Sequence, residues 1–185
     1  ILDEGPRSSI LLPSDWKLVA RDAYNGTVLW KRDLPSWFTQ LWPLKSGPAY
    51  MPRRLVATAD TVYATLGFWA PLSALDPETG EVLHTYRGTK TTEEILLKDG
   101  TLFLVVNDPI TSEKRYTPEH EICWDNTNMA NKGWEWTKKN TKTVMAVDAD
   151  TGEHLWEHEA PVAPMTLAAN EDGVFFFNGD SIVRL

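Results

Sequence analysis

The chain has 185 residues, with 18 basic and 26 acidic side chains, so its formal net charge is −8. An apolar share of 42% and a charged share of 24% are ordinary for a globular protein and exclude wholesale disorder. The excess of acidic residues argues against nucleic-acid binding. No apolar run reaches the roughly 20 residues that span a bilayer. The single cysteine, Cys123, excludes an internal disulfide.

Three hairpin turns of one type are predicted along the chain, within residues 20–30, 74–84 and 146–156. Each segment reads Ala-x-Asp-x-x-(Thr/Asn)-Gly-x-x-Leu-(Trp/His). The Asp side chain can accept backbone N–H bonds across the turn, and Gly adopts a left-handed conformation that a Cβ resists. We therefore assign a structural role to nine repeat positions: Asp22, Gly26, Trp30, Asp76, Gly80, His84, Asp148, Gly152 and Trp156.

A second repeated unit consists of a short apolar strand, a turn and an aromatic strand. Its copies occupy residues 55–65, 95–104 and 165–177, with first strands at 55–57, 95–97 and 165–167. Tyr63 and Phe103 are 40 residues apart, and Phe103 and Phe175 are 72 apart, of which 32 form an excess connection. A period of about 40 residues with four strands predicts a β-propeller blade. The chain is thus expected to be all-β, a partial propeller of about three to four four-stranded antiparallel blades.

The repeated Ala-x-Asp-x-x-Thr-Gly-x-x-Leu-Trp unit resembles the tryptophan-docking repeat of pyrroloquinoline-quinone-type propellers. That family includes quinoprotein dehydrogenases and non-enzymatic relatives such as the outer-membrane assembly lipoprotein. The resemblance covers most of the chain outside residues 32–54 and 109–142, and it implies a complete propeller of seven or eight blades. We therefore expect residues 1–185 to be a propeller segment that is incomplete at both ends, closed by further blades of the same chain or by a partner.

Two long connections are predicted as insertions, at about residues 31–54 and 107–142. Alternate connections of an antiparallel meander lie on the same face, so both insertions are expected on the face opposite the Asp–Gly turns. Long loops of this kind usually carry function. Six of the nine tryptophans lie in connections on that face and are the candidate binding residues: Trp37, Trp42, Trp69, Trp124, Trp134 and Trp136.

The aromatic residues have two readings. Trp30, His84 and Trp156 end the fourth strand of their blades and are expected to pack between neighbouring blades. The six connection tryptophans either contact a ligand or give long loops a small core of their own. If the segment is extended, Trp134 and Trp136 point to one side as a two-ring platform.

No catalytic or metal-binding residue is assigned. One cluster in the second insertion has metal-capable side chains but lacks a second pair to complete a tetrahedral set; its members are His120, Glu121, Cys123 and Asp125. The adjacent cysteines of many quinoprotein enzymes are absent from this stretch.

The sequence therefore favours a non-catalytic module that binds a partner protein or a glycan through its aromatic loops, with no cofactor. The alternatives are a fragment of a quinone-dependent dehydrogenase, which would bind pyrroloquinoline quinone with calcium, or an accessory propeller fused to an unrelated enzyme. Whether the parent protein is an enzyme stays open, although the sequence favours a protein without enzymatic activity. The resemblance implies a periplasmic or exported protein.

Overall fold

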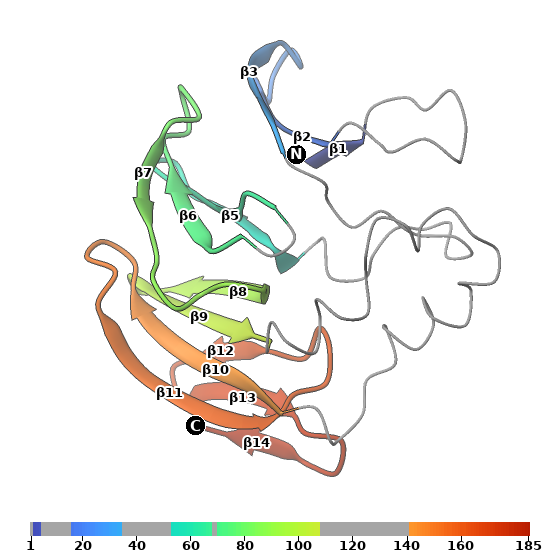
Figure 1. The fold of residues 1–185 in the computed structure, drawn as a ribbon, viewed down its shortest axis with the longest axis vertical. Helices are drawn as coiled ribbons and strands as arrows, with labels where there is room; N and C mark the ends of the chain where they lie inside the picture. Colours follow the sequence, from blue (N-terminus) through green and yellow to red (C-terminus); the bar gives the residue numbers. More distant parts are fainter. Residues whose placement is uncertain (1, 5–15, 35–52, 68–69, 108–140) are drawn as a thin grey trace, which may run out of the picture.

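The computed structural model describes residues 2–4, 16–34, 53–67, 70–107 and 141–185. These residues form β-strands arranged in four antiparallel sheets. The sheets follow one another in chain order along an arc, from the blue N-terminal sheet to the red C-terminal one (Figure 1). The prediction of an all-β, partial propeller is confirmed, and each sheet is one blade.

The first two blades contain seven strands. The first blade consists of β1 (Leu2–Glu4), β2 (Trp16–Arg21) and β3 (Val28–Asp33). The second blade consists of β4 (Leu55–Ala57), β5 (Val62–Thr65), β6 (Leu72–Leu75) and β7 (Val82–Thr85). Every neighbouring pair of strands in these two blades is antiparallel.

The last two blades contain the other seven. The third blade consists of β8 (Thr92–Lys98), β9 (Thr101–Val106), β10 (Thr141–Asp148) and β11 (His154–Pro161). The fourth consists of β12 (Ala168–Asn170), β13 (Gly173–Phe177) and β14 (Ile182–Arg184). The first strand β8 contacts both β4 and β12, as the innermost strands of neighbouring propeller blades do.

The hydrophobic core lies between blades. Side chains alternate across a strand, so β9 sends Leu102 and Leu104 toward the second blade and Val105 toward the fourth. Leu102, Leu104 and Val105 are completely buried. A smaller cluster around Leu18 and Leu75 joins the first blade to the second. Each blade in the described part is therefore stabilised mainly by its neighbours. Among the described residues, none lies in a helix that could cross a membrane.

One predicted strand is wrong. Residues 165–167 were expected to form the first strand of the fourth blade, but that strand is β12, which begins at Ala168. Met165 has a left-handed backbone with φ of 64°, which is incompatible with a strand. The carboxylate of Glu94, from the third blade, accepts the amide N–H groups of Met165 and Leu167 and takes the place of a strand partner.

Candidate functional site

The three repeated Asp residues are turn residues in the structure. Asp148 accepts the amide N–H groups of Asp150 and Thr151 at 3.1 and 2.7 Å, and the Thr151 hydroxyl at 2.8 Å. Asp76 makes the same three kinds of bond, and Asp22 accepts two amides. The bond from the Thr151 amide, the largest effect, holds the pKa of Asp148 below its ordinary value, and that from Thr79 does so for Asp76. These half-buried carboxylates therefore hydrogen-bond within their own turns.

Trp30 joins the first blade to the second. Its indole Nε1–H donates to the carbonyl of Pro77 at 2.8 Å, and its ring lies on Gly80, where a Cβ would approach Cδ2 to 2.7 Å. Pro77 and Gly80 belong to the next Asp–Gly turn. The glycine therefore serves two purposes, since it has a φ of +74° and leaves room for the indole.

His84 occupies the equivalent place between the second and third blades. A Cβ on Gly152 would come within 2.3 Å of the His84 Nε2, so the imidazole packs on this glycine as the indole of Trp30 packs on Gly80. The hydrogen bond comes from another residue, because the buried Tyr86 hydroxyl donates to the Ala149 carbonyl. Ala149 follows Asp148 as Pro77 follows Asp76. His84 and Tyr86 together thus replace one tryptophan.

Sequence reasoning overlooked this second position, two residues after the packing aromatic. Arg32 stands there in the first blade and donates to the Gly80 carbonyl at 2.9 Å. Burial, the largest effect, raises the pKa of the Tyr86 hydroxyl, which therefore remains a donor at any physiological pH. Residues two apart along a strand lie on the same face, and this spacing was the sequence signal that could have identified the second position.

Trp156, the third repeat aromatic, is half-buried, and the centroid of its ring lies 6.0 Å from the centroid of the Phe103 ring.

The candidate binding residues of the loops lie outside the described residues. These are Trp37, Trp42, Trp69, Trp124, Trp134 and Trp136, together with the cluster at residues 120–125. Within the described part, no group of three or more His, Cys, Asp or Glu side chains could hold a metal ion.

The strand ends that border the second insertion hold a buried polar group. Glu93 is the extra residue of a β-bulge in β8, because Thr92 and Glu94 pair with Val106 and Val105. Its carboxylate accepts the Lys142 ammonium at 2.6 Å and the Asn107 side-chain amide at 2.7 Å. Glu93 and Lys142 are 7% and 5% exposed, so this pair is nearly dehydrated. Three strands are therefore tied together where the insertion leaves and rejoins the blade.

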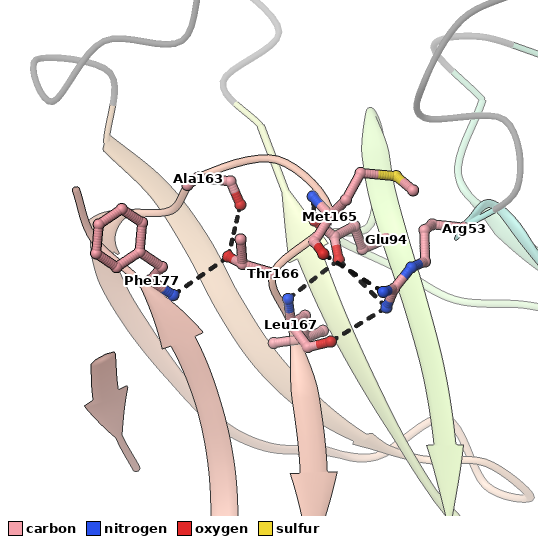
Figure 2. Close-up of polar contacts among 7 residues, drawn as sticks. All are labelled: Arg53, Glu94, Ala163, Met165, Thr166, Leu167 and Phe177. Atoms are coloured by element: carbon pink, nitrogen blue, oxygen red, sulfur yellow. Dashed lines mark hydrogen bonds and ion pairs between the residues drawn. The ribbon is translucent and has the colours of Figure 1, made fainter. Parts of the chain in front are cut away.

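Glu94, the next residue, points to the fourth blade, as Figure 2 shows. Besides the two amides that it accepts, its carboxylate lies 3.8 Å from the Arg53 guanidinium. Arg53 donates in turn to the carbonyls of Leu167 at 3.1 Å and Met165 at 3.4 Å. The connection to the fourth blade is thus held at both its N–H and its C=O groups.

A further polar contact closes this connection. The Thr166 hydroxyl donates to the Ala163 carbonyl at 2.7 Å and accepts the Phe177 amide at 3.2 Å (Figure 2).

Burial is the largest effect on the pKa of Glu94 and raises it. The two amides and the charges of Arg53 and Lys142 lower this pKa and offset the effect of burial only in part. No sequence pattern paired Glu93 or Glu94 with these partners, although two acids inside an apolar strand were a visible anomaly.

The arrangement has two different ends. At one end, the Asp–Gly turns are short and alike, and the Ala149 amide bonds to the Gly100 carbonyl of the neighbouring turn at 2.9 Å. At the other end lie the strand termini that flank residues 35–52 and 108–140, where the buried Glu93 and Glu94 networks stiffen the third blade. A rigid scaffold of this kind can position variable loops for binding.

Comparison with known proteins gives one informative match. The model of the family described as outer membrane protein assembly factor BamB matches residues 14–183. No curated protein matches the chain. Among solved structures, the chain is similar to the computationally designed Ika8 protein, with a TM-score of 0.49 and 13% identity, over 92% of this chain and 41% of that one. The chain therefore spans less than half the length of that designed protein.

Proposed function

Because the chain belongs to the family of the outer-membrane assembly factor BamB, we propose that it is a non-catalytic propeller module that binds a partner protein. Binding is assigned to the loops that follow β3 and β9, at the end of the blades opposite the Asp–Gly turns. The observation that carries the proposal is the contrast between the two ends. Turns of one compact type close one end, whereas long tryptophan-bearing connections leave from the other, where buried charges tie the strand termini that flank the second connection.

The proposal includes a periplasmic location, no cofactor and no catalytic residue. It is supported by the description of the family as an outer membrane protein assembly factor, and by the hydrogen bonds of the repeat Asp residues. Asp76 and Asp148 each accept two amides and a threonine hydroxyl of their own turn at one carboxylate oxygen, which assigns them to turn structure.

The test replaces the two-ring platform. The variant W134A/W136A in the full-length protein should lose most of the partner that cross-links to the wild type in its native compartment, as judged by mass spectrometry of the cross-linked species. Aromatic residues dominate the energy of many interfaces, so a loss of about tenfold or more in captured partner is expected. Tyr24→Ala, at a fully exposed site in the first turn, is the matched control and should keep the partner.

Three outcomes would contradict the proposal. The first is full retention of the partner by folded W134A/W136A. The second is binding of a purified glycan, and of no protein, that the same variant loses. The third is dye-reducing activity of the full-length protein with added pyrroloquinoline quinone and calcium, which would identify a quinone-dependent dehydrogenase instead.

A further inference from the structure

A cleft lined by cations lies between the second and third blades, at the same end as the long connections. Its volume is about 690 Å³. It is bordered by the segment after β7, the end of β9 and the start of β10. We call it the cationic cleft; its lining includes the charged residues Arg87, Lys90, Lys142 and Glu159 and the polar residues Thr85 and Asn107.

Charge in the cleft is opposite to that of the whole chain. The chain carries a net charge of −8, yet among the described residues three cations, Arg87, Lys90 and Lys142, line the cleft with one carboxylate, Glu159. Lys142 is compensated by Glu93 behind the wall. Arg87 and Lys90 are exposed, and neither forms an ion pair with a carboxylate among the residues that the structure describes.

The position of the two exposed cations is well defined. Tyr86, immediately before them, is completely buried and bonded to the third blade, and Thr89 between them is completely buried and donates to the Tyr86 carbonyl at 2.8 Å. The Thr89 hydroxyl also accepts the Leu72 amide at 2.9 Å. Two anchored residues thus hold Arg87 and Lys90 at the rim, so little backbone order is lost when a ligand binds them.

We propose that the cationic cleft binds a carboxylate-rich segment of the partner protein. The inference rests on the proposed function and specifies its chemistry. Arg87 can bind a carboxylate through two parallel N–H bonds, while Lys90 acts as a point charge, and the cleft is large enough for a few residues of an extended peptide. At physiological salt the Debye length is about 8 Å, so the distant acidic residues of the chain repel the segment weakly while the cations at the rim attract it.

The experiment uses the purified full-length protein and the peptide acetyl-Glu-Glu-Glu-Glu-amide, titrated by calorimetry at physiological ionic strength. The same peptide with Gln in place of Glu, and inorganic phosphate, are separate arms. The test variant is R87Q/K90Q and the control is K31Q/K98Q, which makes the same change in net charge outside the cleft, on β3 and β8. Two ion pairs worth about 0.7 kcal/mol each predict a dissociation constant about tenfold weaker in R87Q/K90Q.

Support requires that the Glu peptide bind more tightly than the Gln peptide, that R87Q/K90Q weaken it about tenfold and that K31Q/K98Q change it less than about twofold. Shifts of the Gly88 and Thr141 amide resonances on titration locate the site. Equal affinity of both peptides, or equal loss in both variants, overturns the inference. Binding of phosphate without the Glu peptide also overturns it, in favour of a free oxyanion site. The loop tryptophans are intact throughout, so failure here leaves the W134A/W136A test unaffected.

Discussion

At the residue scale, single side chains complete the junctions between blades. Trp30 combines a ring that packs on Gly80 with a donor that reaches the Pro77 carbonyl. At the next junction the imidazole of His84 supplies the ring and Tyr86 supplies the donor. The two rings are 4.7 Å apart in an edge arrangement, which fixes one against the other.

The role of the Tyr86 hydroxyl can be measured directly. Tyr86→Phe leaves a carbonyl without its partner in a buried site, so the free energy of unfolding should fall by about 1–3 kcal/mol. Tyr24→Phe, at a fully exposed turn position, should change it by less than about 0.5 kcal/mol. Urea denaturation followed by tryptophan fluorescence gives both values. Equal effects in the two variants would mean that the bond to Ala149 contributes nothing.

Glu94 predicts a pH dependence. Its pKa is raised above the ordinary 4.5, so between 4.5 and the raised value the folded chain binds more protons than the unfolded chain. The stability that comes from the protonated carboxyl is present below 4.5 and is lost as the pH rises through the folded pKa. The stability of the wild type relative to Glu94→Gln should therefore decline across this window.

The measurement is urea denaturation of both proteins at several pH values from 4 upward. Glu81→Gln, which replaces an exposed carboxylate in a turn, is the control. A difference between the wild type and Glu94→Gln that is constant or increases with pH would show that desolvation does not dominate at this site.

At the element scale, the Asp–Gly turn is both a hairpin turn and a receptor for the preceding blade. Side chains alternate between the two faces of the outer strand, so Trp30 faces the neighbouring turn while Leu29 beside it is 55% exposed. The equivalent Leu83 and Leu155 are 59% and 47% exposed. The three copies of the turn therefore differ less in their backbone than in what packs on them.

A glycine series separates the two roles of the turn. Gly26→Ala meets no atom within 4 Å and should cost only the left-handed backbone, about 1–2 kcal/mol of unfolding free energy. Gly80→Ala has the same φ but collides with Trp30, so it should cost a further amount of about 1–3 kcal/mol.

The control for this series is the Trp30→Ala background, in which the extra cost of Gly80→Ala should disappear. Persistence of that cost without the indole would assign it to the turn itself. Thermal or urea unfolding of the four variants completes the cycle.

At the scale of the whole molecule, the described blades are joined to their neighbours by separate hydrophobic clusters. One cluster joins the first and second blades, another the second and third, and a third the third and fourth. The polar network of Glu94 and Arg53 spans from the segment before β4 across β8 to the segment before β12. The innermost strands are thus linked by charge as well as by packing.

This organisation predicts local loss of stability. Trp30→Ala should lower the hydrogen-exchange protection of amides in β2, β3, β5 and β6, because the first junction loses its central side chain. Amides of β9, β10 and β13 should keep their protection, since their clusters lie at other junctions. Hydrogen exchange read by mass spectrometry distinguishes the two groups. A uniform decrease would instead indicate that the blades unfold as a single cooperative unit.

Local features were predictable from the sequence because their partners are near in the chain. Asp148 and Thr151 are three residues apart, and each copy of the turn keeps the Asp and the Gly, with Thr or Asn between them. Strands β4 and β5 fall where the second repeat placed them. The Met165 segment was misread because its apolar residues suit a strand, while the carboxylate that holds it out of a strand is 71 residues away.

The sequence alone was enough to predict the blade as consecutive antiparallel strands with a period of about 40 residues and an Asp–Gly turn, because these features follow from short-range hydrogen bonding and side-chain alternation. Two of the described sheets have four strands and two have three. The tertiary structure decided what lies between blades. The pairing of Glu93 with Lys142, the substitution of His84 and Tyr86 for a tryptophan, and the gathering of Arg87 and Lys90 at one cleft depend on residues brought together only when the blades pack. Burial and charge act through distance in space, which the spacing of residues along a chain does not specify.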